Sequence, residues 1–296
     1  MSFQIFADSC ANMPVEYAKK HNIKLLSIPY ITNGEVFYAP EDKNEKEIKD
    51  FYVKLKGKAK ITTSCLNEQD FITAFTPVLE EGKDILYFCF SSALSRTFEC
   101  SQSAIKNLQE QFPDRKILSI DTVCECMGIT ILIDECLKLN NGNASIEEMA
   151  EFVKDFKDKI VHIFTVDDLG HLYRSGRVTA ATYAIGSMFK IKPVLRLDEQ
   201  GKLTNYDKVL GRKKAVINLA ETFAKKVENA ENQTIYIAHA DCEEDALLLK
   251  EQILKRVSVK DFCIDYLEPV ISALGGPGSL ALFFIGNNRA VKWYIG

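Results

Sequence analysis

The sequence lacks the motifs by which many enzymes, metal proteins and membrane proteins are recognised. It contains no G-x-x-x-x-G-K-[ST] loop for nucleotide phosphates and no G-x-S-x-G turn for a nucleophilic serine. No two cysteines have the C-x-x-C spacing typical of zinc sites, since Cys124 and Cys126 are separated by one residue. No apolar run approaches the ~18 residues needed to span a bilayer, and no basic segment followed by an apolar one opens the chain. We therefore expect no metal, no catalytic residue, no membrane span and no signal peptide.

The composition is that of an ordinary globular protein without a strong charge bias. Of 296 residues, 47% are hydrophobic and 26% charged, which suits one large domain or two ordinary ones. The net charge is -4, and the locally basic stretch 54–60 lacks interleaved aromatics, so nucleic acid is not an expected partner. The nine cysteines are odd in number and lie mainly in apolar segments, as Cys89 and Cys136 do, which favours reduced, buried thiols in a cytoplasmic protein.

In the first half of the chain, short apolar runs alternate with amphipathic stretches. Asn33-Gly34 predicts a hairpin turn, Asn67 a helix cap, and Ser145 with Glu148 a capping box. The continuous apolar run 85–90 is typical of a strand buried on both faces. We expect a mostly parallel sheet covered by helices. The predicted strands are 3–7, 24–28, 85–90 and 117–120, and the predicted helices are 45–55, 69–79, 95–110, 124–139 and 146–157.

In the second half, the spacing of apolar and polar segments changes, which predicts a mixed α/β domain. Two apolar segments, 192–197 and 203–210, flank a polar turn as the strands of an antiparallel hairpin do. The glycine-punctuated stretch 168–190 predicts a long helix, and a glycine-rich turn at 275–278 leads into a further apolar segment. The chain as a whole is predicted to have a two-domain α/β fold. The predicted domains are 1–160 and 161–296.

Small hydroxyl or carboxylate residues stand at three predicted junctions with a following helix. These are Asp8-Ser9 after the first strand, Thr62-Thr63-Ser64 before a helix, and Ser91-Ser92 after the buried strand. Helix N-termini carry unpaired amides and a partial positive charge, so an edge at which several meet suits an anion. Each junction alone is explained by helix capping, but three together indicate an anion site without an obligatory cation.

Histidines give little further evidence of catalysis. His21 lies near a helix end and His162 inside a strand, where structural roles are common. His239 ends a predicted strand, at the position where ligands collect in α/β sheets, so a structural and a functional role both stay open.

The order of these junctions, with several glycine and arginine motifs, resembles the DegV family of bacterial fatty-acid-binding proteins. The resemblance runs from Asp8-Ser9 to Gly278 and covers nearly the whole chain. The most specific stretch is Asp168-Leu169-Gly170-His171-Leu172-Tyr173-Arg174-Ser175-Gly176-Arg177-Val178. The other matching segments are Thr63-Ser64, Ser91-Ser92-Ala93-Leu94-Ser95-Arg96-Thr97, Ile191-Lys192-Pro193-Val194-Leu195, Gly211-Arg212-Lys213-Lys214-Ala215 and Gly276-Pro277-Gly278.

The resemblance implies a lipid-binding protein with a long-chain fatty acid at the domain interface and no other cofactor. It also implies a non-catalytic role, in which the protein presents the fatty acid to a separate ATP-dependent kinase. Thr63 and Ser92 are the residues expected to hold the carboxylate. The expected neighbours are Ser91, Ser64 and Gly276, and the residues expected to support the site or contact a partner are Arg174, Arg212 and Asp8.

Three departures from the family pattern stand near the expected site. Ala273-Leu274 replaces the Thr-His pair before the glycine-rich turn, and Leu210 replaces an arginine. Cys65-Leu66 replaces the usual Gln-Pro. We expect lipid binding to survive these changes, and coupling to a kinase is the property that they affect most directly.

The tail of a fatty acid would need an apolar tube, for which the helical stretch 179–189 offers small and large apolar residues. Core packing is the more common explanation of such a stripe, and only the resemblance favours a lining role. Two other functions stay open. One is an acyl hydrolase that uses Ser92 with His239 and Asp241. The other is a sugar- or nucleotide-phosphate enzyme that holds phosphate at the hydroxyl junctions.

Overall fold

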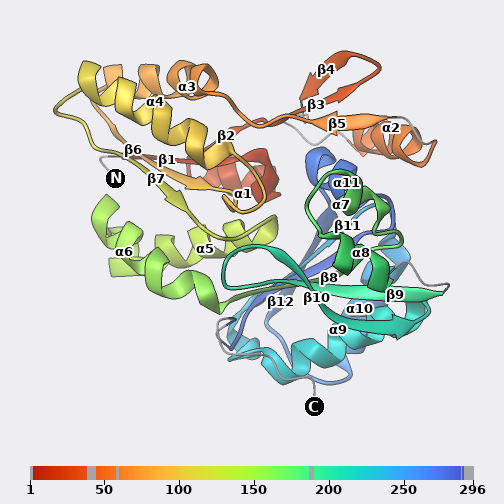
Figure 1. Ribbon diagram of the computed structural model, residues 1–296. Coiled ribbons are helices and arrows are strands. Elements are labelled where there is room, and N and C mark those ends of the chain that lie inside the picture. Colours follow the sequence, from red (N-terminus) through yellow and green to blue (C-terminus); the bar gives the residue numbers. More distant parts are fainter. Residues whose placement is uncertain (1–2, 39–44, 58–59, 187–189, 288, 290–296) are drawn as a thin grey trace.

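The computed structural model describes residues 3–38, 45–57, 60–186, 190–287 and 289, and its described strands form three sheets (Figure 1). The first half of the chain contributes a four-stranded parallel sheet in the order β2-β1-β6-β7, as the sequence predicts. Helices α3 (Glu68–Glu80) and α4 (Thr97–Gln111) pack on it. The strands of this sheet are β1 (Phe3–Asp8), β2 (Ile23–Leu26), β6 (Asp84–Cys89) and β7 (Ile117–Asp121).

The second half contributes a mixed six-stranded sheet in the order β10-β9-β8-β13-β11-β12. Its β9–β10 pair is the predicted antiparallel hairpin, and β11 and β12 run parallel. The two-part α/β fold class that the sequence predicts is therefore confirmed. The strands of this sheet are β8 (Ile160–Thr165), β9 (Ile191–Leu197), β10 (Leu203–Leu210), β11 (Thr234–His239), β12 (Asp261–Tyr266) and β13 (Leu280–Ile285).

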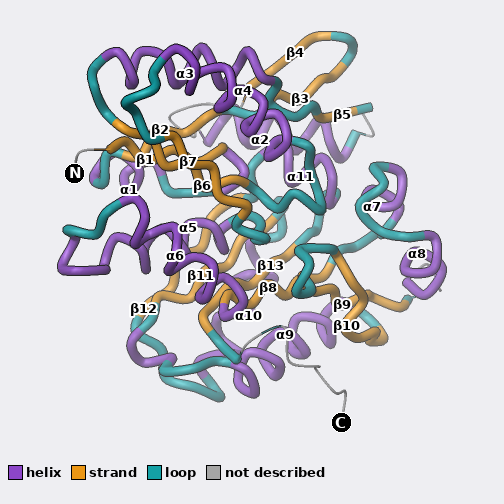
Figure 2. Tube along the Cα trace, turned by 60° about the vertical axis from the view of Figure 1, so that its left-hand side comes forward, coloured by secondary structure: helices purple, strands orange, loops and turns teal. Residues whose placement is uncertain are grey.

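Helix α5 (Met127–Lys138) lies between the two large sheets, and Figure 2 shows it beside β11, β13 and β8. Eight of its twelve residues are buried, because it packs against β8, β11 and β13 of the six-stranded sheet. One continuous hydrophobic core accordingly includes residues of both halves. The other face of the six-stranded sheet is covered by α9 (Arg212–Lys226) and α10 (Glu243–Leu254).

A third, antiparallel sheet in the order β4-β3-β5 stands at one side of the molecule with helix α2 (Glu45–Lys56) (Figure 1). The turn at Asn33-Gly34 joins β3 (Pro29–Thr32) to β4 (Glu35–Tyr38), and both turn residues have the positive φ that a tight hairpin requires. Strand β5 (Ile61–Thr63) was not predicted, because only its pairing with β3 identifies this short segment as a strand.

The predicted long helix over 168–190 is wrong. The chain forms two short helices, α7 (Gly170–Arg174) and α8 (Ala180–Gly186), and residues 187–189 lie outside the described ranges. Gly176 between them has a φ of +76°, which leaves the helical region and turns the chain. This turn brings Arg177 to the wall of an internal cavity.

Both predicted helix caps are confirmed. Asn67 accepts hydrogen bonds from the backbone at the start of α3, and Ser145 does so for α6 (Ile146–Phe156), each within a capping box. The remaining helical segments are η1 (Ser9–Ala11), α1 (Val15–Lys20), η2 (Leu139–Gly142), η3 (Lys157–Lys159), η4 (Ala230–Asn232) and α11 (Pro269–Gly275).

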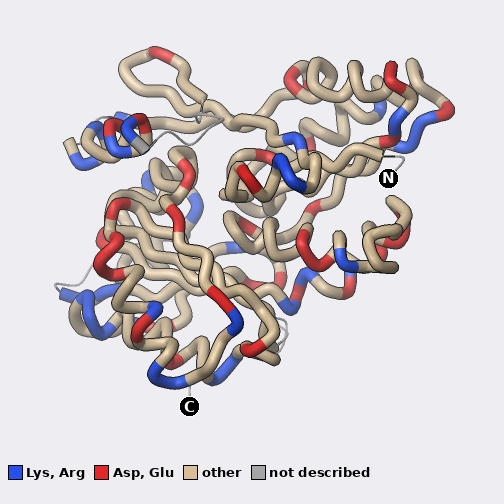
Figure 3. The backbone as a smooth tube through the Cα atoms, turned by 180° about the vertical axis from the view of Figure 1, so that it is seen from behind, with Lys and Arg blue, Asp and Glu red and all other residues tan. Residues whose placement is uncertain are grey.

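Charged residues of both signs are interspersed over the molecule, as Figure 3 shows from behind. This distribution agrees with the sequence, in which no long basic block occurs. Within the described ranges, no helix combines the length and the apolar character that crossing a bilayer requires.

Replacing Tyr52 by Phe tests a bridge between α2 and the second half of the chain. Tyr52 is 1% exposed, and its hydroxyl donates to the Leu267 carbonyl at 2.8 Å and lies 2.7 Å from Ser272 Oγ. Because the change leaves buried polar groups with fewer partners, we expect the free energy of unfolding to fall by about 1–2 kcal/mol in a denaturant titration. The matched control Tyr38→Phe alters a residue that is 59% exposed and should change this energy by less than about 0.5 kcal/mol. Equal losses would contradict the bridging role of the Tyr52 hydroxyl.

Candidate functional site

A cavity of about 170 Å³, here called the outer chamber, lies where both halves of the chain meet. Its walls come from the end of β5, the segment between β6 and α4, the turn after α7, and α11. Segments that are far apart in the sequence therefore bring hydroxyls, thiols and guanidinium groups to one space. The lining residues are Cys10, Ile28, Thr63, Ser64, Cys65, Phe90, Ser95, Arg96, Arg177, Val270, Ile271 and Leu274.

A second cavity of about 50 Å³, the inner chamber, extends from the outer one toward the six-stranded sheet. The two chambers share four wall residues, Phe90, Arg177, Ile271 and Leu274, so they adjoin. The walls of the inner chamber are mainly apolar, which suits a hydrocarbon chain. Its other lining residues are Leu94, Glu125, Cys126, Phe164, Leu172, Leu203, Leu267, Gly275, Ser279, Ala281 and Phe283.

The polar groups of the outer chamber come from the end of a strand and the start of a helix. Thr63 is the last residue of β5 and is partly buried. Ser95 precedes α4, where its Oγ accepts from the Thr97 backbone N–H at 3.3 Å and lies 2.8 Å from Thr97 Oγ1. Because the first backbone N–H groups of α4 have no partner within the helix, this end of the chamber favours negative charge.

Arg177 adds a positive charge to the wall that both chambers share. Its Nε donates to the Leu94 carbonyl at 3.2 Å and its NH1 donates to the Ser175 carbonyl, which hold the guanidinium in place. Burial lowers the pKa of this group, which nevertheless stays charged in proteins. Among the residues that the structure describes, no Asp or Glu forms an ion pair with Arg177. An anionic ligand would therefore find a cation that none of the described carboxylates pairs with.

The structure separates the two hydroxyls that were expected to act together. Thr63 and Ser64 line the outer chamber. Ser92 is exposed and is absent from the lining of both chambers, and its hydroxyl and backbone N–H donate to the carboxylate of Asp121 at 2.5 and 3.1 Å. Ser95, three residues further along the chain, lines the outer chamber with Thr63, which is the role that the sequence analysis gave to Ser92.

The other expected site residues support the chambers from outside. Ser91 is buried, and its Oγ donates to the Gly201 carbonyl at 3.0 Å, which fixes the tip of the β9–β10 hairpin beside β6. Gly276 follows α11 with a φ of +82°, and a Cβ there would lie 2.7 Å from the His171 ring. Asp8 accepts from Tyr87 OH at 3.0 Å and from the Phe90 N–H at 3.3 Å, behind the chamber wall.

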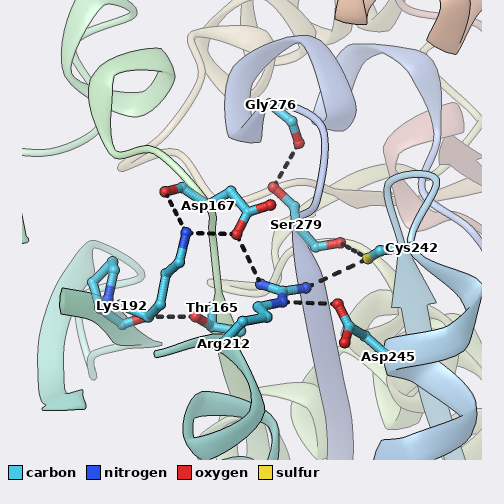
Figure 4. A network of polar contacts seen from close by, with 9 residues as sticks. Thr165, Asp167, Lys192, Arg212, Cys242, Asp245, Gly276 and Ser279 are labelled. Carbon is cyan, nitrogen blue, oxygen red and sulfur yellow. Dashed lines mark hydrogen bonds and ion pairs between the residues drawn. The ribbon is translucent and has the colours of Figure 1, made fainter. Parts of the chain in front are cut away.

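Arg212 belongs to a polar network beneath the glycine-rich turn (Figure 4). Its Nε donates to Asp245 at 2.8 Å, and its NH1 lies 3.8 Å from Asp167, which also pairs with Lys192 at 2.7 Å. Ser279 connects this network to the chambers, because it lines the inner one and its carbonyl accepts from Cys242 Sγ at 3.4 Å, while Arg212 NH2 donates to the same sulfur at 3.5 Å. Arg174 is exposed on α7 and lines neither chamber.

The geometry does not assemble the hydrolase that stayed open in the sequence analysis. The Ser92 hydroxyl is bound to Asp121, whereas His239 is buried against Tyr266 with ring centroids 4.6 Å apart. The helical stretch considered for the tail tube also differs from its expected role. Its described members Ala180, Ala181 and Ala184 are exposed, and the side chains of 185–189 lie outside the described set. Within the described residues, no group of three or more His, Cys, Asp or Glu could hold a metal ion.

A larger and more open cavity of about 650 Å³ runs along the edge strand β2. Lys19, Lys24 and Asn22 stand among its lining residues beside apolar ones such as Leu25. We assign the candidate site to the two chambers in spite of their smaller volume. They join hydroxyls and a guanidinium at one end to an apolar interior at the other, which is the arrangement that an amphipathic ligand requires.

The fold and the two chambers define an α/β protein that encloses an apolar cavity with a polar mouth. A family model described as "Uncharacterised protein, DegV family" matches residues 2–287, and the chain belongs to the DegV family. A DegV domain-containing protein of Clostridium perfringens is 40% identical over 288 residues, which are 97% of this chain and 98% of the relative. A second relative, from Lactococcus lactis, is 32% identical over 285 residues, or 96% of this chain and 98% of its own.

Solved structures of the family share the fold over their whole length. A DegV lipid binding protein from Thermotoga maritima has a TM-score of 0.84 at 25% identity, with coverage of 98% of this chain and 100% of its own. A second Thermotoga maritima protein, whose structure is described as revealing a fatty acid binding function, has a TM-score of 0.82 at 25% identity. That likeness covers 97% of this chain and 100% of the other.

Replacing Glu268 by Gln tests the buried carboxyl group at the start of α11. Burial raises the pKa of Glu268 from 4.5 to about 7, although the N–H groups of Val270 and Ile271 and the Ser9 hydroxyl favour the ionised form. A raised carboxyl pKa contributes stability that is complete below about pH 4.5 and is lost as the pH rises through about 7. We expect the free energy of unfolding of the unmodified protein to fall over this interval by on the order of 2 kcal/mol more than that of Glu268→Gln. Parallel pH profiles of the two proteins in denaturant titrations would contradict the assignment.

Proposed function

We propose that this protein binds a long-chain fatty acid, with the carboxylate in the outer chamber and the hydrocarbon tail directed through the inner chamber. The walls of the inner chamber must move apart to admit the tail, because its volume is about 50 Å³. The observation that carries the proposal is that the cavity lined by Thr63 and Ser95 shares wall residues with the apolar cavity lined by Phe164 and Phe283. The related structures described as lipid binding and fatty acid binding support it. The ligand would lie between an N-terminal unit, 1–160, and a C-terminal unit, 161–296.

The energetics assign different tasks to the two chambers. Burial of about 15 methylene groups contributes on the order of 12 kcal/mol at roughly 0.8 kcal/mol each, before about 4 kcal/mol or more of association cost. Each hydrogen bond to the charged carboxylate adds only about 1.5–3 kcal/mol. The tail therefore supplies most of the affinity, and the polar groups of the outer chamber fix the orientation of the ligand.

We assign the carboxylate to the hydroxyls of Thr63 and Ser95 and to the guanidinium of Arg177. All three residues line the outer chamber, whereas Ser92 does not. Ser64 contributes to the rim, and the contacts of Ser91 and Gly276 support the walls from outside. Asp8 and Arg212 have the same supporting role, because their polar contacts lie behind the walls.

We further propose that the protein is a carrier that does no chemistry on its ligand. The rim residues Ser64 and Arg96 are exposed, so a separate ATP-dependent kinase could reach the bound carboxylate at this end. Arg174, exposed on α7, is the residue that we assign to partner contact. A reducing compartment such as the bacterial cytoplasm suits a chain with nine free cysteines.

Alanine substitutions test whether Ser95 or Ser92 binds the carboxylate. We expect Thr63→Ala and Ser95→Ala each to weaken fatty acid binding by about 10- to 100-fold, because each removes one hydrogen bond to a charged group. Ser92→Ala is the matched control and should leave the dissociation constant unchanged. The measurement is a titration with a fluorescent fatty acid, preceded by mass spectrometry of the lipid that the purified protein carries. Loss of binding in Ser92→Ala with none in Ser95→Ala would contradict the assignment.

The charge of Arg177 can be tested through the ligand as well as through the protein. We expect Arg177→Met, which keeps much of the apolar stem, to weaken binding of a fatty acid by about tenfold or more. Binding of the corresponding fatty alcohol, which has no negative charge, should change by less than about threefold. An equal loss for both ligands would show that Arg177 acts through packing alone.

A further inference from the structure

A carboxyl group stands in the apolar wall of the inner chamber. Glu125 lies just before α5 and lines this cavity together with apolar residues such as Leu172, Phe164 and Phe283. It is 8% exposed, and burial alone raises the pKa of its carboxyl group from 4.5 to about 7. Among the residues that the structure describes, none donates a hydrogen bond to this carboxyl group. Buried polar groups without a partner are rare in native proteins, so this one calls for a specific explanation.

The backbone of Glu125 is held on both sides. Its N–H donates to His162 Nε2 at 3.3 Å, and its carbonyl accepts from the Gly128 N–H at 3.0 Å. Gly128 permits this close approach of α5 to β8, because a Cβ there would lie 2.0 Å from His162 Nε2. The next residue, Cys126, has a φ of +48°, a conformation that is uncommon for a residue with a side chain and that clusters at functional sites. The turn therefore fixes Glu125 at the chamber wall.

The carboxyl oxygens of Glu125 border open space. Other unpartnered oxygens, such as Oδ1 of Asp8 and Oδ1 of Asn205, are fully enclosed by protein atoms, but neither oxygen of Glu125 is enclosed in this way. Because the residue lines the inner chamber and is almost hidden from bulk solvent, that space is the chamber itself. A fatty acid tail in the chamber would lie against the carboxyl group and exclude water from it.

We infer that Glu125 selects long-chain fatty acids that carry a hydroxyl group on the hydrocarbon chain, because such a hydroxyl is the partner that its carboxyl group lacks. The inference rests on the proposed fatty acid binding and names the kind of fatty acid. A hydroxyl suits the carboxyl group in both protonation states, since it donates to a carboxylate and accepts from a carboxylic acid. A keto group only accepts and so serves the protonated form alone, and an unsubstituted tail serves neither form.

The carboxyl group of Glu125 should decide which of two tails binds better. A hydroxyl in an apolar cavity without a partner is disfavoured, and a hydrogen bond to a strongly polar group offsets this cost. In the unmodified protein, the hydroxylated tail meets a partner, whereas the unsubstituted tail leaves the carboxyl group unpaired. Removal of the carboxyl group should therefore reverse the order of the two affinities.

The test uses the full-length protein with octadecanoic acid and a series of its isomeric derivatives, hydroxylated at successive carbons from the middle to the end of the chain. The measurement is competition with a fluorescent fatty acid. We expect at least one hydroxylated isomer to bind the unmodified protein about tenfold more tightly than octadecanoic acid. In Glu125→Met, the same isomer should bind about tenfold more weakly than octadecanoic acid. The control Glu151→Met, at a side chain that is 69% exposed and lines neither chamber, should keep the original preference.

A crystal structure of the unmodified protein with the preferred isomer gives a second measurement that needs no folded variant. We expect the tail hydroxyl within hydrogen-bonding distance of the Glu125 carboxyl group. A hydroxyl away from Glu125, or tighter binding of octadecanoic acid than of every hydroxylated isomer, would overturn the inference and leave the proposed function intact. Protein that binds neither octadecanoic acid nor any of its hydroxylated derivatives would refute the proposed function, and this inference with it.

Discussion

Both chambers depend on the capping of the short helix α11 by the carboxyl group of Glu268. Its Oε2 accepts from the N–H groups of Val270 and Ile271 at 2.7 and 3.3 Å, and its Oε1 accepts from the Ser9 hydroxyl at 3.2 Å. A helix of seven residues has little stability of its own, so its position comes from such contacts. Ile271 and Leu274 on this helix line both chambers. One buried carboxyl group thus connects the end of the first strand to the wall that the two cavities share.

The elements with local sequence signals were predictable, and those that depend on distant contacts were not. The Asn33-Gly34 turn and the capping boxes at Asn67 and Ser145 each combine residues only a few positions apart. Strand β5 escaped prediction because its partner β3 lies some thirty residues earlier. The stretch 168–190 has a helical composition, but Gly176 takes a positive φ that composition alone does not reveal.

The site was predictable only in part, again because local sequence signals do not reveal distant contacts. Thr63 lines the outer chamber, and its hydroxyl junction was recognised from the sequence. The direction of the serines after β6 depends on β7, whose Asp121 binds Ser92 and draws it away from the chamber. Ser95 was hidden among residues that start a predicted helix. The hydrogen bond that its Oγ accepts from the N–H of Thr97, two residues later, is the local signal that could have identified it. Residue type identified the junctions, and tertiary contacts decided which side chains face the cavity.

A crystal structure with a long-chain fatty acid that carries bromine at the end of its tail tests the central claim most directly, because anomalous scattering locates the bromine. Our account predicts the carboxylate within hydrogen-bonding distance of the Thr63 and Ser95 hydroxyls, and the bromine between Phe164 and Phe283 in the inner chamber. A bromine in the open cavity along β2, with the two chambers unchanged, would contradict it.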